Sequence, residues 1–275
     1  MDITKTQLEQ IDQQICDFLR QDRQFILEQM QKHYAVGQKT GRRDLVTSLD
    51  KENQQRIIAF LEPLLQPAKI LAEETERQIT DSTGLVWVID PIDGTMNFVK
   101  QGEDFAVMVA LYEDGHPILG YIYDVMRDRL LHGGPGLGAA YCNEVKLTSP
   151  ENLPLAEGLV GLSGPMLIAN KFNFQTIEAQ SLGSRVLGSA GIEFSRVILG
   201  KQVGYASTLK PWDFAAGNAL AMVLGLMVDR IDGSPLNMLK SGVVLVATKK
   251  AFATIMNIVK WACAVTEQWV TGFFM

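Results

Sequence analysis

The stretch WVIDPIDGTMNF, residues 87–98, carries the strongest structural signal in this sequence. Its first residues form a short apolar run that is typical of a buried strand, and this run stops at the carboxylate of Asp90. A proline then fixes the backbone, a second carboxylate follows at Asp93, and Gly94 permits a tight turn. The segment therefore predicts a strand end at which Asp90 and Asp93 face one concave site.

Two carboxylates held close together repel each other unless a cation lies between them. The pair Asp90 and Asp93 therefore favours a divalent metal, and oxygen ligands favour Mg²⁺. The backbone amides of Gly94 and Thr95 could face a phosphate if a helix begins there. The alternative interpretation is an Asx-type turn at the end of a strand, with no ligand.

Two further acidic segments bear on this choice. Upstream, residues 71–76 read LAEETE and include Glu73, and a solvated loop is the plain alternative for such an acidic run. Downstream, residues 210–217 read KPWDFAAG, which places Asp213 at the start of an apolar helix. An N-cap is the plain alternative for Asp213.

The first half of the chain indicates helices followed by strands. Apolar residues at spacings of three and four predict an N-terminal helix: Leu8, Ile11, Ile15 and Leu19, continuing to Ile26 and Met30. A break is expected around residues 37–43, and a second helix through residues 57–65. Strand-like runs then follow at residues 85–89, 105–112, 118–123, 130–131 and 139–142, the last two joined across a glycine-rich turn. This order predicts an α+β half.

The second half alternates between strands and helices, which indicates layered α/β packing. Strands are predicted at residues 158–162, 203–206 and 243–247, and helices at residues 172–182, 189–199 and 214–226, with one more at the end. Ser149-Pro150 is the candidate boundary. We therefore predict an N-terminal half at residues 1–149 and a C-terminal half at residues 150–275.

Length and composition exclude several classes of protein. The 275 residues are 47% hydrophobic and 20% charged, which is typical of one large or two small globular domains and not of a disordered chain. The net charge is −6 and no basic run is present, so nucleic acid is a poor candidate for the main ligand. The apolar run at residues 214–228 is too short to span a bilayer.

The cysteines and the N-terminus favour a cytoplasmic protein. Cys16, Cys142 and Cys263 are far apart and form no CxxC pair, which argues against a disulfide scaffold and a zinc knot. Residues 1–24 are polar and lack the apolar core of a signal peptide.

Taken in order, the Glu-Glu pair, DPIDGTxNF and WDxAAG closely resemble the motifs of the inositol monophosphatase family. The segment DLVTSLD at residues 44–50 and the glycine-rich stretch at residues 136–143 also resemble segments of that family. The similarity runs from roughly residue 44 to residue 247. It implies an αβαβα sandwich of the inositol monophosphatase and fructose-1,6-bisphosphatase type. It further implies a lithium-sensitive, homodimeric phosphomonoesterase that uses two or three Mg²⁺ ions.

The resemblance also assigns roles to individual residues. It implies metal binding by Glu73, by Asp90 as the bridging carboxylate, by the Ile92 carbonyl, and by Asp93 and Asp213. Gly94 and Thr95 match the phosphate-binding turn, and Thr95 with Asp50 matches the pair that orients and deprotonates the attacking water. Ser189, Ala190 and Ala206 match positions at the substrate. An N-cap for a helix starting near Lys51 is an equally good interpretation of Asp50.

The chemistry agrees with this resemblance. Phosphate monoester hydrolysis needs positive charge on the transferring group and an activated water, and two Mg²⁺ ions supply both. Four carboxylates, at Glu73, Asp90, Asp93 and Asp213, match the charge of two dications. None of the three histidines lies near these motifs, which argues against a phosphohistidine or a Ser-His-Asp mechanism.

Two other motifs are considered and rejected. Gly136-Leu137-Gly138 lacks the third glycine of a dinucleotide-binding loop, because Tyr141 stands in that place, and a hairpin turn is the better interpretation. The haloacid-dehalogenase motif Asp-x-Asp-Gly-Thr has one residue between its aspartates, whereas two separate Asp90 from Asp93.

One departure from the family bears on specificity. Ala206 stands where inositol-hydrolysing members carry an acidic residue that contacts the polyol ring. Strict inositol preference is therefore in doubt, although inositol monophosphate remains the leading candidate. The alternatives are the 2′-phosphate of NADP, fructose 1,6-bisphosphate and a 3′-phosphoadenosine nucleotide. A non-catalytic binding module is the competing class of function.

Overall fold

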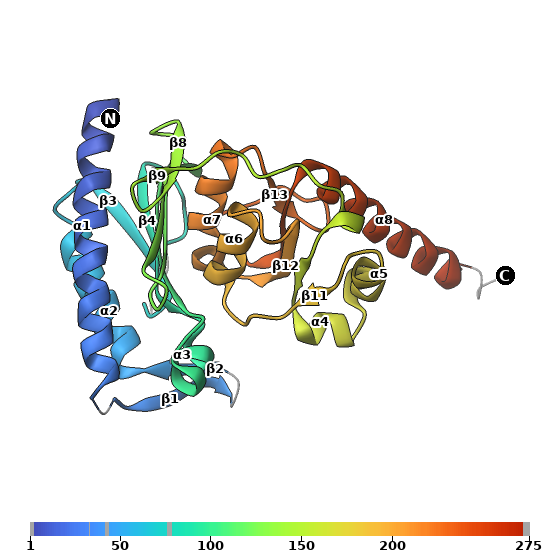
Figure 1. Cartoon of the computed structure of the whole chain (residues 1–275), viewed down its shortest axis with the longest axis horizontal. Helices are drawn as coiled ribbons and strands as arrows, with labels where there is room; N and C mark the ends of the chain where they lie inside the picture. Colours follow the sequence, from blue (N-terminus) through green and yellow to red (C-terminus); the bar gives the residue numbers. More distant parts are fainter. Residues whose placement is uncertain (1–2, 33, 42–43, 76–78, 272–275) are drawn as a thin grey trace.

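The chain forms two large sheets stacked with helices in five layers (Figure 1). The computed structural model describes residues 3–32, 34–41, 44–75 and 79–271. Helices α1 and α2 cover the outer face of a seven-stranded sheet, α6 and α7 lie between the two sheets, and α8 lies beyond the five-stranded sheet. The predicted αβαβα sandwich is confirmed.

The outer helical layer consists of α1 (Lys5–Met30) and α2 (Ser48–Leu61). The apolar stripe predicted for the N-terminal helix is buried against the sheet and includes Leu8, Ile11, Ile15, Leu19 and Ile26. The break predicted between the first two helices is confirmed, because α1 ends at Met30 and α2 begins at Ser48. The sequence did not predict the hairpin of β1 (Val36–Gly41) and β2 (Asp44–Thr47) that lies in this interval. Its sequence has no apolar alternation, so backbone pairing forms a strand that periodicity does not indicate.

The seven-stranded sheet has the order β3-β4-β5-β6-β7-β8-β9, in which only β3 and β4 are parallel. Its strands are β3 (Ala68–Ala72), β4 (Leu85–Asp93), β5 (Ala106–Glu113), β6 (His116–Asp124), β7 (Arg129–Gly134), β8 (Ala139–Cys142) and β9 (Val145–Lys146). All five strands predicted for the first half are present. Every residue of β4 is buried, which explains its continuous apolar run.

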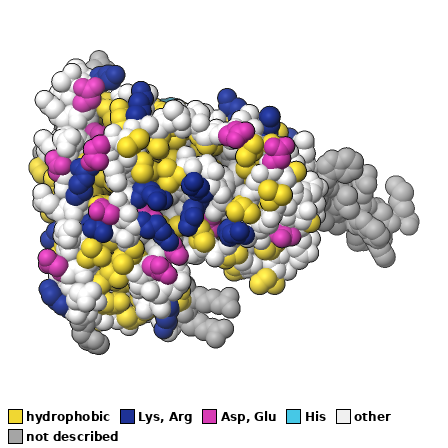
Figure 2. Space-filling model, in the orientation of Figure 1, with side chains coloured by type: hydrophobic (Ala, Val, Ile, Leu, Met, Phe, Trp, Pro, Cys, Tyr) yellow, Lys and Arg dark blue, Asp and Glu magenta, His cyan; other side chains and the backbone are white. Residues whose placement is uncertain are grey.

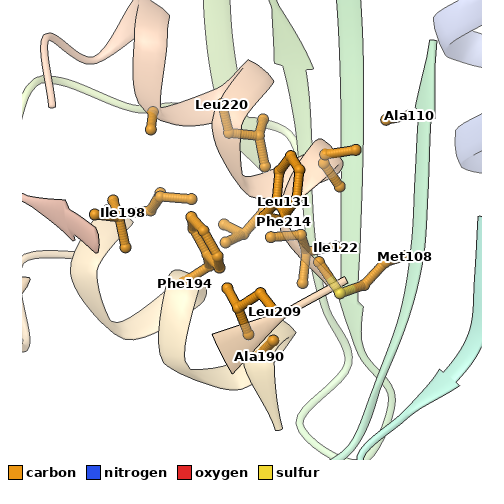
Figure 3. Packing of buried hydrophobic residues seen from close by; sticks show 14 of the residues in the cluster. Met108, Ala110, Ile122, Leu131, Ala190, Phe194, Ile198, Leu209, Phe214 and Leu220 are labelled. Atoms are coloured by element: carbon orange, nitrogen blue, oxygen red, sulfur yellow. The ribbon is translucent and has the colours of Figure 1, made fainter. Parts of the chain in front are cut away.

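The middle layer joins the two sheets through α6 (Ala190–Ile198) and α7 (Pro211–Val223). Figure 3 shows Phe194 of α6 and Phe214 of α7 packed with Met108, Ile122 and Leu131 of the first sheet. This packing fixes the N-termini of both helices against the end of β4.

The helix predicted at residues 214–226 starts earlier and ends earlier in the structure. It ends at Val223, Gly225 adopts a left-handed conformation with φ +69°, and β13 (Met227–Arg230) follows. The apolar run therefore contains a helix, a turn and a strand. Because the end of α7 and the first two residues of β13 are apolar, hydropathy alone gives no sign of the turn.

The five-stranded sheet has the order β11-β10-β12-β14-β13. Its strands, besides β13, are β10 (Val160–Leu162), β11 (Ser184–Arg185), β12 (Gly204–Leu209) and β14 (Gly242–Ala247). The remaining helices are α3 (Thr95–Gln101), α4 (Gly164–Ile168), α5 (Phe174–Ala179), α8 (Lys249–Thr271) and the 3₁₀ turns η1 (Leu155–Glu157) and η2 (Lys171–Asn173). The candidate boundary Ser149-Pro150 falls in the segment between β9 and η1. The division at this point stays a prediction.

The surface distributes its charge unevenly. Figure 2 shows Lys and Arg side chains gathered near the middle of one face, whereas acidic and basic side chains are interspersed along α1. Among the described residues, none of the helices combines the length and apolar character that crossing a bilayer requires.

Candidate active site

The end of β4 turns two aspartates toward the same place. Residues three apart in a regular strand face opposite sides of the sheet. Here Asp90 pairs with Met108 and Asp93 with Ala106, so β4 holds one residue more than β5 across this interval. This bulge contains Pro91, a residue that sheets tolerate at bulges. It brings Asp90 and Asp93 together, as the sequence predicted.

The third carboxylate comes from the middle layer. Asp213 lies in the first turn of α7, where its Oδ2 accepts a hydrogen bond of 2.8 Å from the backbone N–H of Lys210. One carboxylate oxygen each from Asp90, Asp93 and Asp213 lies within 4.8 Å of the others. The N-cap interpretation of Asp213 is wrong, because Lys210 is the N-cap of α7; Asp213 completes the capping box from the third position of the helix and also belongs to the acidic cluster.

The acidic cluster opens into a cavity of about 430 Å³. This cavity brings together seven residues that the sequence singled out: Glu73, Asp90, Ile92, Asp93, Gly94, Thr95 and Asp213. Glu73 directly follows β3, and its backbone N–H donates to the Ile89 carbonyl of β4 at 3.2 Å. The parallel pairing of β3 with β4 thus places Glu73 beside the aspartates.

The N-terminus of α6 holds Asp93 in place. The backbone N–H groups of Ala190 and Gly191 donate to its two oxygens at 3.1 and 2.7 Å, and the Ser189 hydroxyl donates to Oδ2. Ser189 is also the N-cap of α6 and accepts from the Ile192 N–H. These donors and the helix dipole favour the charged form of Asp93.

Asp50 and Thr95 form a second polar group at the cavity. The Thr95 hydroxyl lies 3.0 Å from Oδ1 of Asp50 and 3.1 Å from the Ile92 carbonyl oxygen. The expectation that Asp50 is an N-cap is wrong, because α2 begins at Ser48 and Thr47 caps it. Asp50 instead completes the capping box, with Oδ2 accepting from the Thr47 N–H at 2.8 Å. The capping contact uses one carboxylate oxygen and leaves the other facing Thr95.

The electrostatics of the cluster fit a divalent cation. Burial raises the pKa of Asp213 to about 8, and the charge of Asp93 adds to the effect. Burial raises the pKa of Asp93 to about 6, and raises that of Asp90 well above its usual range together with the charges of Glu73, Asp93 and Asp213. A cation would offset this repulsion, and an all-oxygen donor set suits Mg²⁺.

Two charged residues at the site were not predicted. Lys39, from the β1–β2 hairpin, places Nζ 2.9 Å from Oε1 of Glu73 and also contacts Glu74. Glu193 of α6 is 1% exposed, lines the neighbouring cavity and accepts from Gln202 Nε2 at 2.7 Å. Neither residue stands in a recognisable motif. The one feature of the sequence that could have identified Glu193 is its position as an acidic residue in a strongly apolar helix.

The raised pKa values predict how pH affects the metal-free protein. Asp93 and Asp213 hold protons in the folded state at pH values where they are ionised in the unfolded chain, whose aspartates have pKa values of about 4. Between roughly pH 4 and pH 8 the folded state therefore binds more protons, and the free energy of unfolding falls as pH rises. We expect the Tm in EDTA to fall from pH 6 to pH 8, and Mg²⁺ to raise it more at pH 8. Asp213→Asn should flatten the decline in EDTA; an equal slope in this variant would contradict the assignment.

A second cavity of about 280 Å³ adjoins the first. The two share Asp93, Gly188 and Asp213, and the predicted residues Ser189 and Ala190 line the second one. Its other walls include Ser163, Pro165, Val186, Tyr205 and Ser207. A molecule bound at the acidic cluster can therefore extend into this space.

The structure corrects the expectation for Ala206. Its side chain is 1% exposed and belongs to the core formed by the five-stranded sheet and α8. Because side chains alternate along β12, the flanking residues Tyr205 and Ser207 face the second cavity instead. The Ala206 side chain therefore packs in the core and is not among the residues that line the second cavity.

Comparison with known proteins agrees with this geometry. A model of the inositol monophosphatase family matches residues 7–262. The chain belongs to the inositol monophosphatase family. The structural likeness is equally extensive: a solved IMPase/NADP phosphatase complexed with Mg²⁺ and phosphate superimposes with a TM-score of 0.85 at 31% identity. The match covers 91% of this chain and 95% of that one.

Two of the curated relatives are named as phosphatases. An inositol-1-monophosphatase of Bacillus subtilis is 33% identical over 90% of this chain and 96% of the relative. A fructose-1,6-bisphosphatase/inositol-1-monophosphatase of Thermotoga maritima is 32% identical over 74% of this chain and 77% of the relative. Like these family members, the chain is a phosphatase.

Proposed function

We propose that this chain hydrolyses inositol monophosphate to inositol and phosphate in a Mg²⁺-dependent reaction. The observation that carries the proposal is the cavity in which Glu73, Asp90, Asp93 and Asp213 converge beside the Thr95 hydroxyl. The family of the chain and the Mg²⁺ and phosphate in the solved relative support it.

Four carboxylates and one carbonyl would hold the metal. The charges of Glu73, Asp93 and Asp213 all act on Asp90, to which the family resemblance assigns the bridging role, and the Ile92 carbonyl borders the same cavity. When bound, Mg²⁺ lowers the pKa of a coordinated water and stabilises the charge of the leaving oxygen. We propose two or three ions, of which two match the four carboxylate charges.

Thr95 and Asp50 orient and deprotonate the attacking water. The Thr95 hydroxyl donates its hydrogen to Asp50, so its oxygen can accept a hydrogen bond from water. Asp50 is buried, and burial raises the pKa of its carboxyl group, which favours uptake of a proton passed through Thr95. α3 begins at Thr95 after the N-cap Gly94, and we expect the backbone N–H groups of these two residues to contact the phosphate oxygens.

The second cavity supports alternative substrates. Ser163 and Ser207 provide hydroxyl groups and Val186 an apolar surface beyond the acidic cluster. A substrate larger than inositol phosphate, such as NADP, fructose 1,6-bisphosphate or a 3′-phosphoadenosine nucleotide, would occupy both cavities. The names of the structural neighbour and of the Thermotoga relative favour the first two.

A small substrate panel tests the proposal. We expect phosphate release from inositol 1-phosphate with Mg²⁺ and none in EDTA, measured beside NADP, fructose 1,6-bisphosphate and 3′-phosphoadenosine 5′-phosphate. A higher kcat/KM for one of the other three would keep the chemistry and replace the substrate. No release from any of the four with Mg²⁺ would contradict the proposal and favour a binding module.

The remaining properties of this proposal come from the family resemblance. We propose inhibition by lithium, a homodimer and a cytoplasmic location, in which Cys16 and Cys142 stay unpaired. The net charge of −6 disfavours nucleic acid as the main ligand.

A further inference from the structure

A second cluster of metal-ligating side chains lies away from the phosphatase site. Asp12 and Cys16 stand four residues apart on α1, which places them on the same face of the helix. His132 comes from β7, on the sheet face that α1 covers. Its Nδ1 lies 3.0 Å from each oxygen of Asp12, and one donor atom each from Asp12, Cys16 and His132 lies within 4.8 Å of the others.

The orientation of His132 favours a cation at Nδ1. Its Nε2 lies 2.9 Å from the carbonyl oxygen of Asn143, which can only accept, so Nε2 carries a hydrogen. In the neutral ring the lone pair of Nδ1 then points at the Asp12 carboxylate, and this contact is repulsive unless a proton or a metal ion lies between the two groups. Histidines that bind metals usually donate their other N–H to a carbonyl or carboxylate in this way.

Tyr121 adds a second, independent observation. Its side chain is 0% exposed, and its hydroxyl makes no hydrogen bond of regular geometry within the described part of the chain. Tyr121 pairs directly with His132 across β6 and β7, and the two rings are stacked with their centroids 6.5 Å apart. A buried hydroxyl therefore lies beside the cluster, on the sheet face that α1 covers.

The cluster is reached through a cavity of its own. Asp12, Cys16 and His132 line a space of about 530 Å³ between α1 and β7–β9, together with Glu9 and Tyr141. This cavity shares no lining residue with the two at the acidic cluster. It offers an entry path and room for a solvent ligand.

We propose that Asp12, Cys16 and His132 bind a zinc-type divalent transition metal, with water from the cavity as fourth ligand. A thiolate and an imidazole select zinc over magnesium. Tetrahedral coordination at ordinary bond lengths separates the nitrogen and oxygen ligands by about 3.4 Å, so small side-chain shifts suffice. The Cys16 thiol releases its proton to solvent when the sulfur–metal bond forms. The bound ion ties α1 to β7.

Cobalt provides a direct test on the full-length protein. With excess Mg²⁺ present, we expect one equivalent of Co²⁺ to give a thiolate-to-metal charge-transfer band, which the all-oxygen phosphatase site cannot produce. Cys16→Ser should abolish the band, and Cys142→Ser, which changes the other described free cysteine, should keep it. No band in the wild type, or an equal band in Cys16→Ser, would overturn the proposal.

Thermal stability provides a second readout. Zn²⁺ at about 100 times its Kd should raise the Tm of wild type and Cys142→Ser by roughly 5 °C or more. The Tm of Cys16→Ser and His132→Gln should not change. An equal rise in all four proteins would show that zinc acts elsewhere, and Asp12–His132 would then be a simple ion pair. Neither readout depends on the phosphatase activity.

Discussion

An Asp93→Asn variant is expected to release phosphate about 10³-fold more slowly than the wild type in the presence of Mg²⁺. Asp93 is one of three aspartates whose oxygens lie within 4.8 Å of one another. The neutral amide removes one negative charge from this set without changing the size of the side chain. Loss of several kcal/mol of transition-state stabilisation by the metal corresponds to this factor. When the rate is measured as a function of Mg²⁺ concentration, Asp93→Asn should also need a higher Mg²⁺ concentration than the wild type to reach half of its maximal rate.

A matched control separates this effect from damage to the fold. The amide introduced by Asp93→Asn would turn its NH₂ group toward one of the N–H donors of Ala190 and Gly191, so the Tm of the variant must be measured as well. Asp22→Asn makes the same chemical change at another buried carboxylate. Asp22 lies on α1, and its Oδ1 is 3.1 Å from Nε of Arg56 on α2. We expect Asp22→Asn to be less stable and nearly fully active. Similar rates for Asp93→Asn and the wild type would refute the metal site.

The parts of the site that lie within one sequence segment could be predicted. Asp90, Asp93 and Gly94 follow one another at a strand end, and local chemistry alone indicates a turn that carries carboxylates. The bulge in β4 that brings the two aspartates together could not be predicted, because it depends on the pairing with β5. Lys39 was missed for a similar reason, since the β1–β2 hairpin that carries it has no hydrophobic pattern.

The substrate side depends on strand register, which sequence specifies only weakly. The position matched to the family's acidic residue is Ala206, yet pairing with β10 and β14 turns its side chain into the core. A shift of one residue along a strand exchanges the two faces. The residues that face the cavity, Tyr205 and Ser207, could therefore be identified only after the sheet was known. The ends of α7 and α2 were also predicted only to within about three to four residues, because the hydrophobic pattern does not mark where a helix begins or ends.

Gly94→Ala is expected to lower both stability and activity, because Gly94 is closely packed against Ser189. Its φ of +87° is left-handed, and an added Cβ would lie 2.8 Å from Cβ of Ser189 and 3.3 Å from the Asp104 carbonyl oxygen. The left-handed backbone and the steric overlap together should cost about 2–4 kcal/mol of unfolding free energy. Relief of the overlap moves Ser189, whose hydroxyl holds Asp93, so activity should fall about 10²-fold.

Gly84→Ala is the matched control for this prediction. Gly84 has a similar φ of +72°, but a Cβ there would meet no atom within 4 Å. In Gly84→Ala the left-handed backbone should therefore still cost about 1–2 kcal/mol of unfolding free energy. The new Cβ overlaps no other atom and does not displace a residue that holds Asp93. We expect Gly84→Ala to lose some stability in urea denaturation and to keep its kcat. If both variants lose the same stability and both stay active, the contact between Gly94 and Ser189 does not position Asp93. If only Gly94→Ala loses activity, the close approach of α3 and α6 is what aligns the carboxylates for metal binding.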